Sequence, residues 1–256
     1  GSSPQGIDLS TSVENEWLCG EIVRAYGLPV APSRMATFGE FKSLIVERFD
    51  RRLSDDGSWW IRLPQEDFCQ ALAVPPDRKY ESDGGPGVED ALKLLSGSAS
   101  SKADREQFLL VQLAFWLLAA TDGHAKNFSV FLNAGDSYRL TPLYDVLSAW
   151  PVIGHGANSL SPQKARLAMG LRAKNMHYRL MEIRARHYRE LAEKSGVPTV
   201  WGRMQALIED VPSSLAAVEK RLPSDFPQVL WERISNGMLS QAEAFRNDSK
   251  RPANPR

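Results

Sequence analysis

The chain has 256 residues, of which 43% are hydrophobic and 24% are charged, and its formal net charge is zero. This length can bury one substantial core, or two lobes that share a cleft. The balanced charge argues against autonomous, non-specific nucleic-acid binding, because such binding relies on a basic surface.

The length of the apolar runs and the spacing of the two cysteines indicate a cytoplasmic protein. The longest apolar run, residues 109–120, is shorter than the roughly 20 residues that cross a bilayer, and no signal peptide is visible. Cys19 and Cys69 lack metal-ligand spacing, so we expect buried thiols in a reducing compartment. We therefore expect no membrane contact.

The first quarter of the chain is expected to hold one helix followed by strands. A capping box at residues 11–14 predicts a helix that starts near residue 12 and stops at Gly27. Strand-like segments follow at residues 33–38, 41–49 and 59–63.

From Pro64 onward the pattern becomes helical. Pro64 suits the first position of a helix. The polar, glycine-rich segment 79–87 is expected to be either a functional surface loop near a cleft or a plain connector. Helices are predicted at residues 88–95, 104–120, 163–169, 177–195, 200–222 and 227–245, with short strands at 128–132 and 138–141.

This order of elements predicts an α+β fold that is mostly helical, rather than an alternating α/β fold. We expect a flexible start at residues 1–7 and a disordered tail at 248–256. Between them, residues 8–63 would form the remainder of a small lobe with its hinge, and residues 64–247 a large helical lobe with one embedded β-hairpin.

Three polar residues after the long apolar helix have a spacing that suits phosphoryl transfer. Asp122 follows that helix directly, Asn127 lies five residues later, and Asp145 follows the predicted hairpin. A hairpin between Asn127 and Asp145 would bring them side by side as oxygen ligands for Mg²⁺. Asp122 would then accept a hydroxyl proton, as in protein-kinase catalytic loops.

Other interpretations of this segment remain open. Asp122 and Asn127 alone are also common turn residues. Lys126 is a candidate to neutralise charge on the transferred phosphate. His124 would either orient the loop or contact phosphate, and no partner at zinc spacing supports a metal-ligand role.

The sequence resembles the HipA family of serine/threonine kinase toxins from bacterial toxin–antitoxin pairs, from about residue 8 to 245. The resemblance implies a protein-kinase-like fold and use of ATP and Mg²⁺. It rests on residues 46–51, which are similar to the family's hinge, on residues 63–67 and 79–87, and on catalytic and metal-binding segments at 120–129 and 140–145.

The resemblance also implies a role for each matching residue. Asp122 would accept the proton of a target Ser or Thr, and Asn127 and Asp145 would bind Mg²⁺. The backbones of Glu47 and Phe49 would contact adenine. The remaining nucleotide-site residues would be Gln65, His124, Lys126 and Tyr144.

The family resemblance implies partners as well. The expected antitoxin is a small dimeric DNA-binding protein, HipB, so DNA would be contacted only through it. Aminoacyl-tRNA synthetases are among the protein substrates that the resemblance implies.

One departure from the family pattern concerns the start of the chain. The family's N-terminal subdomain, Gly-rich phosphate loop and phosphate-binding lysine should precede Asp8, and none is visible in this sequence. Glu16 is a candidate partner of that lysine, or simply a solvated helix carboxylate. We therefore expect weak or no independent phosphotransfer. The alternative function is a truncated, inactive kinase-like fragment that binds an antitoxin or target.

Overall fold

The computed structural model describes residues 6–250 of the chain, so parts of the expected flexible start and tail, residues 1–5 and 251–256, lie outside it. The helices are α1 (Ser12–Ala25), α2 (Phe68–Ala71), α3 (Val88–Ser96), α4 (Ser101–Leu118), α5 (Ala185–Lys194), α6 (Val200–Glu209), α7 (Val211–Glu219) and α8 (Gln228–Ser249). The strands are β1 (Ser33–Phe38), β2 (Phe41–Val46), β3 (Arg51–Leu53), β4 (Trp60–Arg62), β5 (Gln65–Asp67), β6 (Ser129–Asn133), β7 (Ser137–Leu140), β8 (Arg166–Arg172) and β9 (Met176–Arg179).

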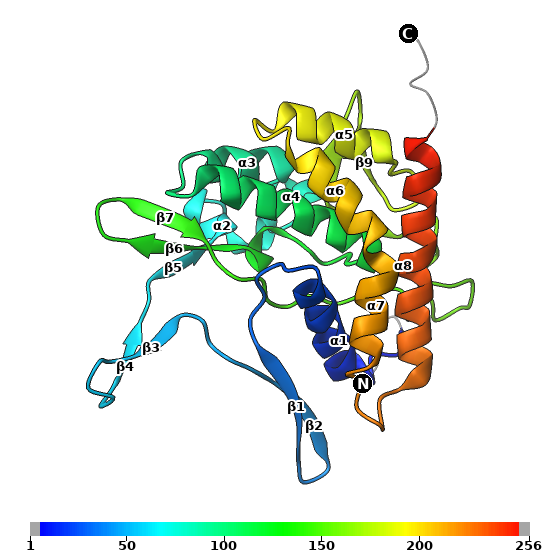
Figure 1. Cartoon of the computed structure of the whole chain (residues 1–256), viewed down its shortest axis with the longest axis horizontal. Helices are drawn as coiled ribbons and strands as arrows, with labels where there is room; N and C mark the ends of the chain where they lie inside the picture. Colours follow the sequence, from blue (N-terminus) through cyan, green and yellow to red (C-terminus); the bar gives the residue numbers. More distant parts are fainter. Residues whose placement is uncertain (1–5, 251–256) are drawn as a thin grey trace.

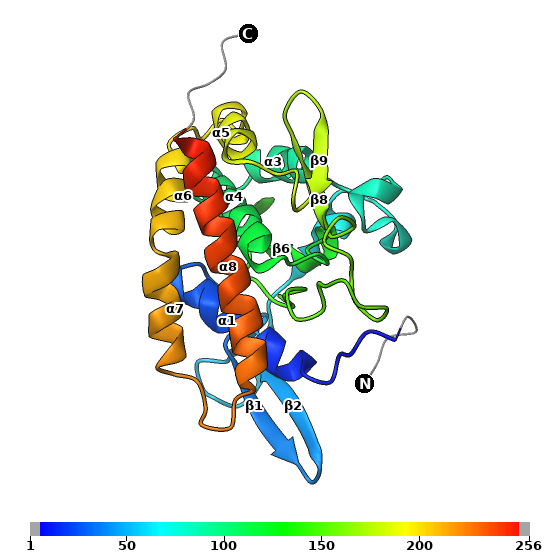
Figure 2. The ribbon, with the colours of Figure 1, turned by 90° about the vertical axis from the view of Figure 1, so that its right-hand side faces the viewer.

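Helix α4 forms the centre of the core. Its residues from Phe108 to Leu118 are all buried, and it packs against α3, α6 and α8 (Figures 1 and 2). A helix that is apolar on all sides is stable only when other elements surround it. The prediction of an α+β, mostly helical fold is therefore confirmed.

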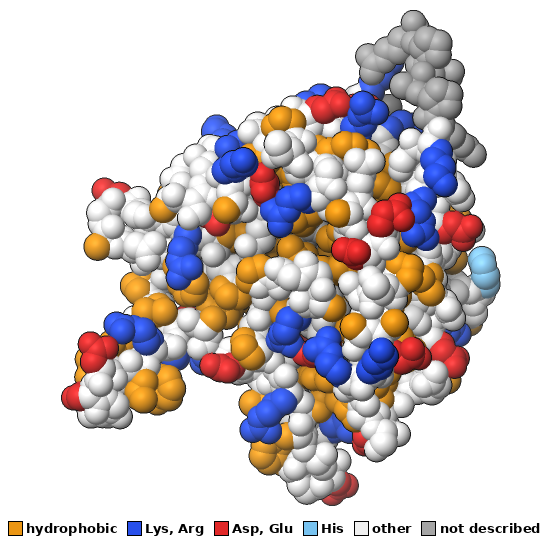
Figure 3. All heavy atoms as spheres, viewed as in Figure 1, with side chains coloured by type: hydrophobic (Ala, Val, Ile, Leu, Met, Phe, Trp, Pro, Cys, Tyr) orange, Lys and Arg blue, Asp and Glu red, His pale blue; other side chains and the backbone are white. Residues whose placement is uncertain are grey.

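The strands form small antiparallel sheets around this helical core. Hairpins β1–β2 and β3–β4 project from the body, and hydrophobic side chains are visible on both (Figures 1 and 3). Strands β5, β6 and β7 form one three-stranded sheet, in which Val130 pairs with Leu140. The last hairpin, β8–β9, lies in the helical half of the chain.

Several local predictions were wrong. Residues 163–169 were expected to be helical, but β8 starts at Arg166, which pairs with Arg179 of β9, and its central residues are buried. The helix expected at residues 177–195 starts only at Ala185, because residues 177–179 belong to β9. Pro64 does not begin a helix, because β5 pairs with β6 and α2 starts only after its Asp67 cap. The capping box is absent, since Thr11 makes no side-chain cap and Glu14 binds Lys42 instead.

The segment after β7 joins the first part of the chain to the helical part. Leu143 exchanges backbone hydrogen bonds with Pro29 and Ala31, at 2.9 and 2.8 Å. The buried Asn15 amide of α1 donates to the carbonyl of Ser148 and accepts from its N–H. This pairing fixes α1 against the segment that carries Asp145. None of the helices within residues 6–250 is both long and apolar enough to cross a membrane.

Two glycines in helices make a matched stability test. A Cβ on Gly237 of α8 would overlap the Trp150 ring, whereas a Cβ on Gly202 of α6 meets nothing within 4 Å. We expect Gly237→Ala to lower the free energy of unfolding by about 1–3 kcal/mol through overpacking. Gly202→Ala should raise it by about 0.5–1 kcal/mol through helix propensity. Urea unfolding measures both, and equal effects of the two substitutions would contradict the packing assigned to Trp150.

Candidate active site

The candidate catalytic loop begins where α4 ends. Ala119 ends the helix in a left-handed conformation, with φ 49°. Gly123 lies against Phe115 so closely that a Cβ would overlap the ring. The loop then enters the short helix η3 (Ala125–Asn127), whose first turn is capped by the Asn127 side chain accepting from the His124 N–H. The contact between Gly123 and Phe115 of α4 thus fixes the backbone next to Asp122.

Asn127 and Asp145 converge as the sequence predicts. The Asn127 amide donates to the Asp145 carboxylate at 2.9 Å, across the β6–β7 hairpin. Asp145 has φ 56°, a left-handed conformation that costs most residues about 1–2 kcal/mol. Such a conformation persists only where surrounding contacts impose it, and it often marks a functional site.

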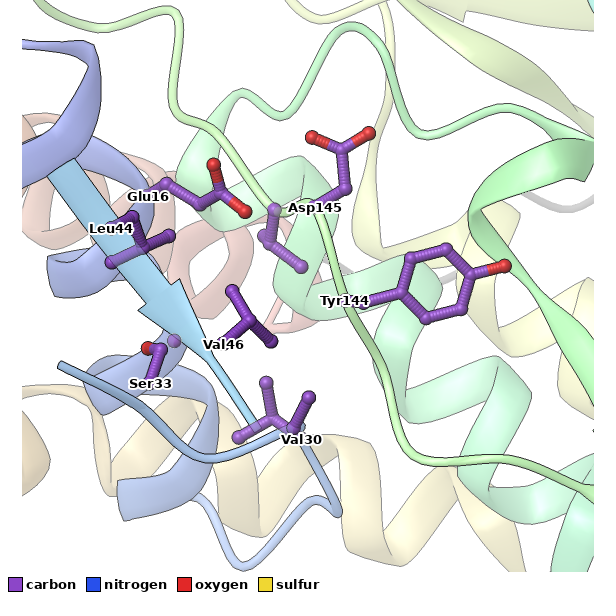
Figure 4. A pocket seen from close by; sticks show the side chains of 10 residues that line it. Glu16, Val30, Ser33, Leu44, Val46, Tyr144 and Asp145 are labelled. Atoms are coloured by element: carbon purple, nitrogen blue, oxygen red, sulfur yellow. The ribbon is translucent and has the colours of Figure 1, made fainter. Parts of the chain in front are cut away.

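Glu16 of α1 adds a second carboxylate beside Asp145. Both residues line one small pocket, and Figure 4 shows the Glu16 carboxylate directed toward the segment that carries Tyr144 and Asp145. Burial, and then the charge of Asp145, raise the pKa of Glu16 from 4.5 to about 7. This cluster therefore favours an additional positive group, either a cation or a proton.

The side-chain oxygens of Asn127 and Asp145 are of the kind that binds Mg²⁺. Mg²⁺ takes one or two protein carboxylates and completes its shell with water and phosphate oxygens. Within the described residues, no three His, Cys, Asp or Glu side chains form a complete metal cage. Asn127 and Asp145 can supply two ligands, provided that the Asn127 amide turns its oxygen away from the His124 N–H.

Asp122 is accessible but not free. Its side chain is 62% exposed, and it accepts a hydrogen bond of 2.5 Å from the Tyr80 hydroxyl. Burial, and then this hydrogen bond, raise the pKa of Tyr80 to about 12. The phenol is therefore protonated at neutral pH and donates to Asp122.

His124 lies beneath this pair. Its Nε2 is 3.9 Å from the Asp122 carboxylate, its ring packs edge-on against Tyr80, and the residue is only 5% exposed. Burial is the main cause that lowers its pKa from 6.5. His124 is therefore neutral at physiological pH. Its Nδ1 is buried and has no hydrogen-bond partner in the structure.

Lys126 is ion-paired rather than pointing freely into the site. Its Nζ donates to Asp67 at 2.9 Å, and this hydrogen bond raises the pKa of Lys126. Asp67 also caps helix α2 by accepting from the Gln70 N–H. A phosphate that used Lys126 would have to compete with Asp67.

Of the two expected hinge residues, Phe49 lies next to Tyr144. The Phe49 ring is 5.7 Å from the Tyr144 ring, and the Glu47 N–H donates to Pro32. Tyr144 in turn donates to the Lys126 carbonyl. Gln65 of β5 has a buried side-chain oxygen with no partner in the structure. The pocket lined by Glu16, Tyr144 and Asp145 has a volume of only about 20 Å³, so an adenine base would need it to widen.

Sequence reasoning missed the roles of Tyr80 and Asp67. Both lie in segments that the sequence had singled out, the glycine-rich segment 79–87 and residues 63–67. Their partners are 42 and 59 residues away in the chain, so spacing alone could not reveal these contacts.

Glu16 generates a pH prediction. Because its pKa is raised in the native state, the folded chain binds this proton more tightly than the unfolded chain does. The free energy of unfolding should therefore fall as pH rises from about 4.5 to 7, by on the order of 1–3 kcal/mol. Glu16→Gln should remove that fall, whereas Glu40→Gln, on an exposed turn, should retain it. Urea unfolding at pH 4.5 and 8 measures the difference, and an unchanged slope in Glu16→Gln would contradict this assignment.

Solved structures show what this fold is similar to. A HipA chain in a Shewanella oneidensis complex of HipA, HipB and operator DNA superimposes with a TM-score of 0.78 at 23% identity, covering 92% of this chain and 56% of that one. The Helicobacter pylori proinflammatory kinase CtkA matches with a TM-score of 0.62 at 12% identity, covering 93% of this chain and 86% of its own. The predicted kinase-like fold is confirmed.

Sequence comparisons point to the same family. A putative kinase Y4mE of Sinorhizobium fredii is 35% identical over 81% of this chain and 47% of its own length. The serine/threonine-protein kinase toxin HipA of Shewanella oneidensis is 32% identical over 53% of this chain and 34% of its own. The chain thus spans less than half the length of these relatives. A sequence model described as the HipA-like C-terminal domain matches residues 3–218, and the chain therefore belongs to the HipA family.

Proposed function

We propose that this chain is the kinase core of a HipA-like toxin, which transfers the γ-phosphate of Mg²⁺-ATP to a Ser or Thr of a protein. The observation that carries this proposal is the contact between Asn127 and Asp145, 2.9 Å apart, on the same loop system as the exposed Asp122. Phosphoryl transfer needs mainly alignment and charge neutralisation, and these three side chains can provide both.

Each of the three residues has a distinct role in this proposal. Asn127 and Asp145 would hold Mg²⁺, which neutralises phosphate charge when it is bound. Asp122 accepts the proton of the acceptor hydroxyl. The acceptor oxygen bonds to the γ-phosphorus, the bond from that phosphorus to its bridging oxygen breaks, and ADP leaves.

Lys126, His124 and the hinge would complete the nucleotide site. Lys126 would exchange Asp67 for a phosphate oxygen. The neutral His124 has a buried Nδ1 without a partner among residues 6–250, which supports a loop-orienting or phosphate-contacting role. The backbones of Glu47 and Phe49 would contact adenine, beside Gln65 and Tyr144.

The proposed partner is a HipB-like DNA-binding antitoxin in the cytoplasm. The similar Shewanella HipA was solved with HipB and operator DNA, which supports a corresponding partner here. The net charge of zero, with both signs interspersed over the face in Figure 3, suits indirect contact with DNA. An aminoacyl-tRNA synthetase remains the substrate implied by the family resemblance.

A second candidate function is a kinase-like module that binds an antitoxin or target protein without catalysis. The ion pair between Lys126 and Asp67 and the narrow pocket beside Asp145 favour it, because both oppose nucleotide entry. Nucleotide binding distinguishes the two candidates.

The first test is calorimetric titration with ATP and Mg²⁺. We expect Mg²⁺-dependent binding that Asp145→Asn weakens at least about tenfold, since a carboxylate ligand of the ion is lost. Asn also tolerates the left-handed backbone at this position. The matched control is Asp136→Asn, because Asp136 has φ 55° on the exposed turn that connects β6 to β7, at the other end of the hairpin from Asn127. Absence of binding by the unmodified chain would favour the non-catalytic module.

A second test isolates Asp122. Asp122→Asn should retain Mg²⁺-ATP binding but lose about 100-fold or more of ATP consumption, because a general base contributes roughly that much. The measurement is ADP formation over hours at high protein concentration. Asp55→Asn, at a 98% exposed side chain, is the control that should match the unmodified chain. Equal ADP formation in Asp122→Asn would rule out Asp122 as the base.

A further inference from the structure

Tyr80 occupies the position on Asp122 that a substrate hydroxyl would need. Its phenol donates a hydrogen bond to the Asp122 carboxylate, which is the same kind of bond that an acceptor Ser or Thr would make. Tyr80 comes from the glycine-rich segment 79–87, which is 42 residues away in sequence and has no part in the mechanism described above.

The glycine-rich segment is built to hold Tyr80 in place. The Tyr80 carbonyl accepts from the N–H groups of Asp83 and Gly85, at 3.0 and 2.9 Å. A Cβ on Gly85 would overlap the Arg78 carbonyl, so only glycine allows this tight path. Glu81 fixes the same segment to strand β8 by accepting from the Gly170 N–H at 2.7 Å.

A pocket opens beside this contact. It has a volume of about 230 Å³, and Tyr80 and Thr121 place it directly next to Asp122. The rest of its wall comes from η2 (Glu81–Asp83), β8 and β9, including Ser82, Asp83, Arg166 and Tyr178. Pockets for drug-sized ligands hold roughly 300–1,000 Å³, so this one suits one or two side chains better than a whole metabolite.

The charges of the pocket are available to a ligand. Within residues 6–250, neither Asp83 nor Arg166 forms an ion pair, although Arg172 on the same strand pairs with Glu89. A carboxylate and a guanidinium in one pocket suit the mixed polar side chains of a polypeptide. The pocket therefore has the size and the chemistry for residues that flank an acceptor hydroxyl.

We infer that this pocket receives the Ser- or Thr-bearing segment of a protein substrate, and that the Tyr80 hydroxyl holds the place of the acceptor hydroxyl on Asp122 until the substrate displaces it. This inference rests on the proposed kinase function, whose acceptor side it specifies. Tyr80 acts as a positioning residue: it keeps the Asp122 carboxylate hydrogen-bonded and oriented in the absence of substrate.

The probe is an immobilised peptide library with a central Ser and randomised flanking residues, compared with the same library carrying a central Ala. The unmodified chain should prefer Ser peptides. Tyr80→Phe keeps the ring that packs on His124 but removes the competing hydroxyl. Tyr80→Phe should raise the affinity for Ser peptides by roughly threefold to tenfold, which corresponds to the net free energy of one hydrogen bond. The affinity for Ala peptides should not change.

A second variant tests the pocket independently of Tyr80. Ser82 is exposed on the pocket wall, so Ser82→Trp should fill the pocket without disturbing the core and should abolish the preference for Ser peptides. Ser213→Trp, at an exposed position on α7, is the matched control and should retain that preference. Thermal unfolding of all variants verifies that each is folded.

Several results would overturn the inference. One is that Tyr80→Phe binds Ser peptides no more tightly than the unmodified chain does. Another is that Ser82→Trp retains the preference for Ser peptides over Ala peptides. If the chain binds Mg²⁺-ATP but no peptide, the pocket assignment is wrong while the proposed function stands. If it binds neither, the kinase proposal fails and this inference fails with it. Hydroxyl-dependent peptide binding without ATP binding would instead leave a protein-binding pocket in a non-catalytic module.

Discussion

The site depends on how the chain from Thr141 to Ala149 is anchored, since this segment has no helix or strand of its own. Its polar backbone groups must find partners elsewhere, because buried N–H and C=O groups without partners are strongly destabilising. Pro29 and Ala31 pair with Leu143, and the Asn15 amide pairs with Ser148. Two parts of the chain that are distant from it in sequence, residues 29–31 and Asn15, therefore fix this stretch of backbone.

This anchoring explains why Asp145 sits in a left-handed conformation next to Asn127. Because Val130 of β6 pairs with Leu140 of β7, the residues that precede β6 and those that follow β7 lie at the same end of the hairpin. The Tyr144 hydroxyl then bonds the Lys126 carbonyl and Ser129, at 2.9 and 2.6 Å. Hydrogen bonds within the protein thus join the two halves of the proposed metal site.

The sequence predicted those parts of the site that depend on local spacing. A hairpin between Asn127 and Asp145 follows from short apolar strands around a turn, so their convergence could be expected. Strand β8 could not, because Leu167 to Leu171 are all buried and show no alternation that distinguishes a strand from a buried helix. The contacts from Tyr80 to Asp122 and from Lys126 to Asp67 could not be predicted from the sequence either, because they depend on where the glycine-rich segment and β5 lie in the folded chain.

The two long-range contacts share one physical consequence. Asp122 and Lys126 each carry a charge that the proposed reaction needs, and each already has an intramolecular partner. A ligand that binds them exchanges one hydrogen bond for another, so the net gain per contact is smaller than the roughly 0.5–1.5 kcal/mol of a hydrogen bond made in place of one to water. A nucleotide would have to displace Asp67 from Lys126, and an acceptor hydroxyl would have to displace Tyr80 from Asp122. Each intramolecular partner therefore weakens the binding of one ligand, so the site discriminates against ligands that cannot replace the lost hydrogen bond.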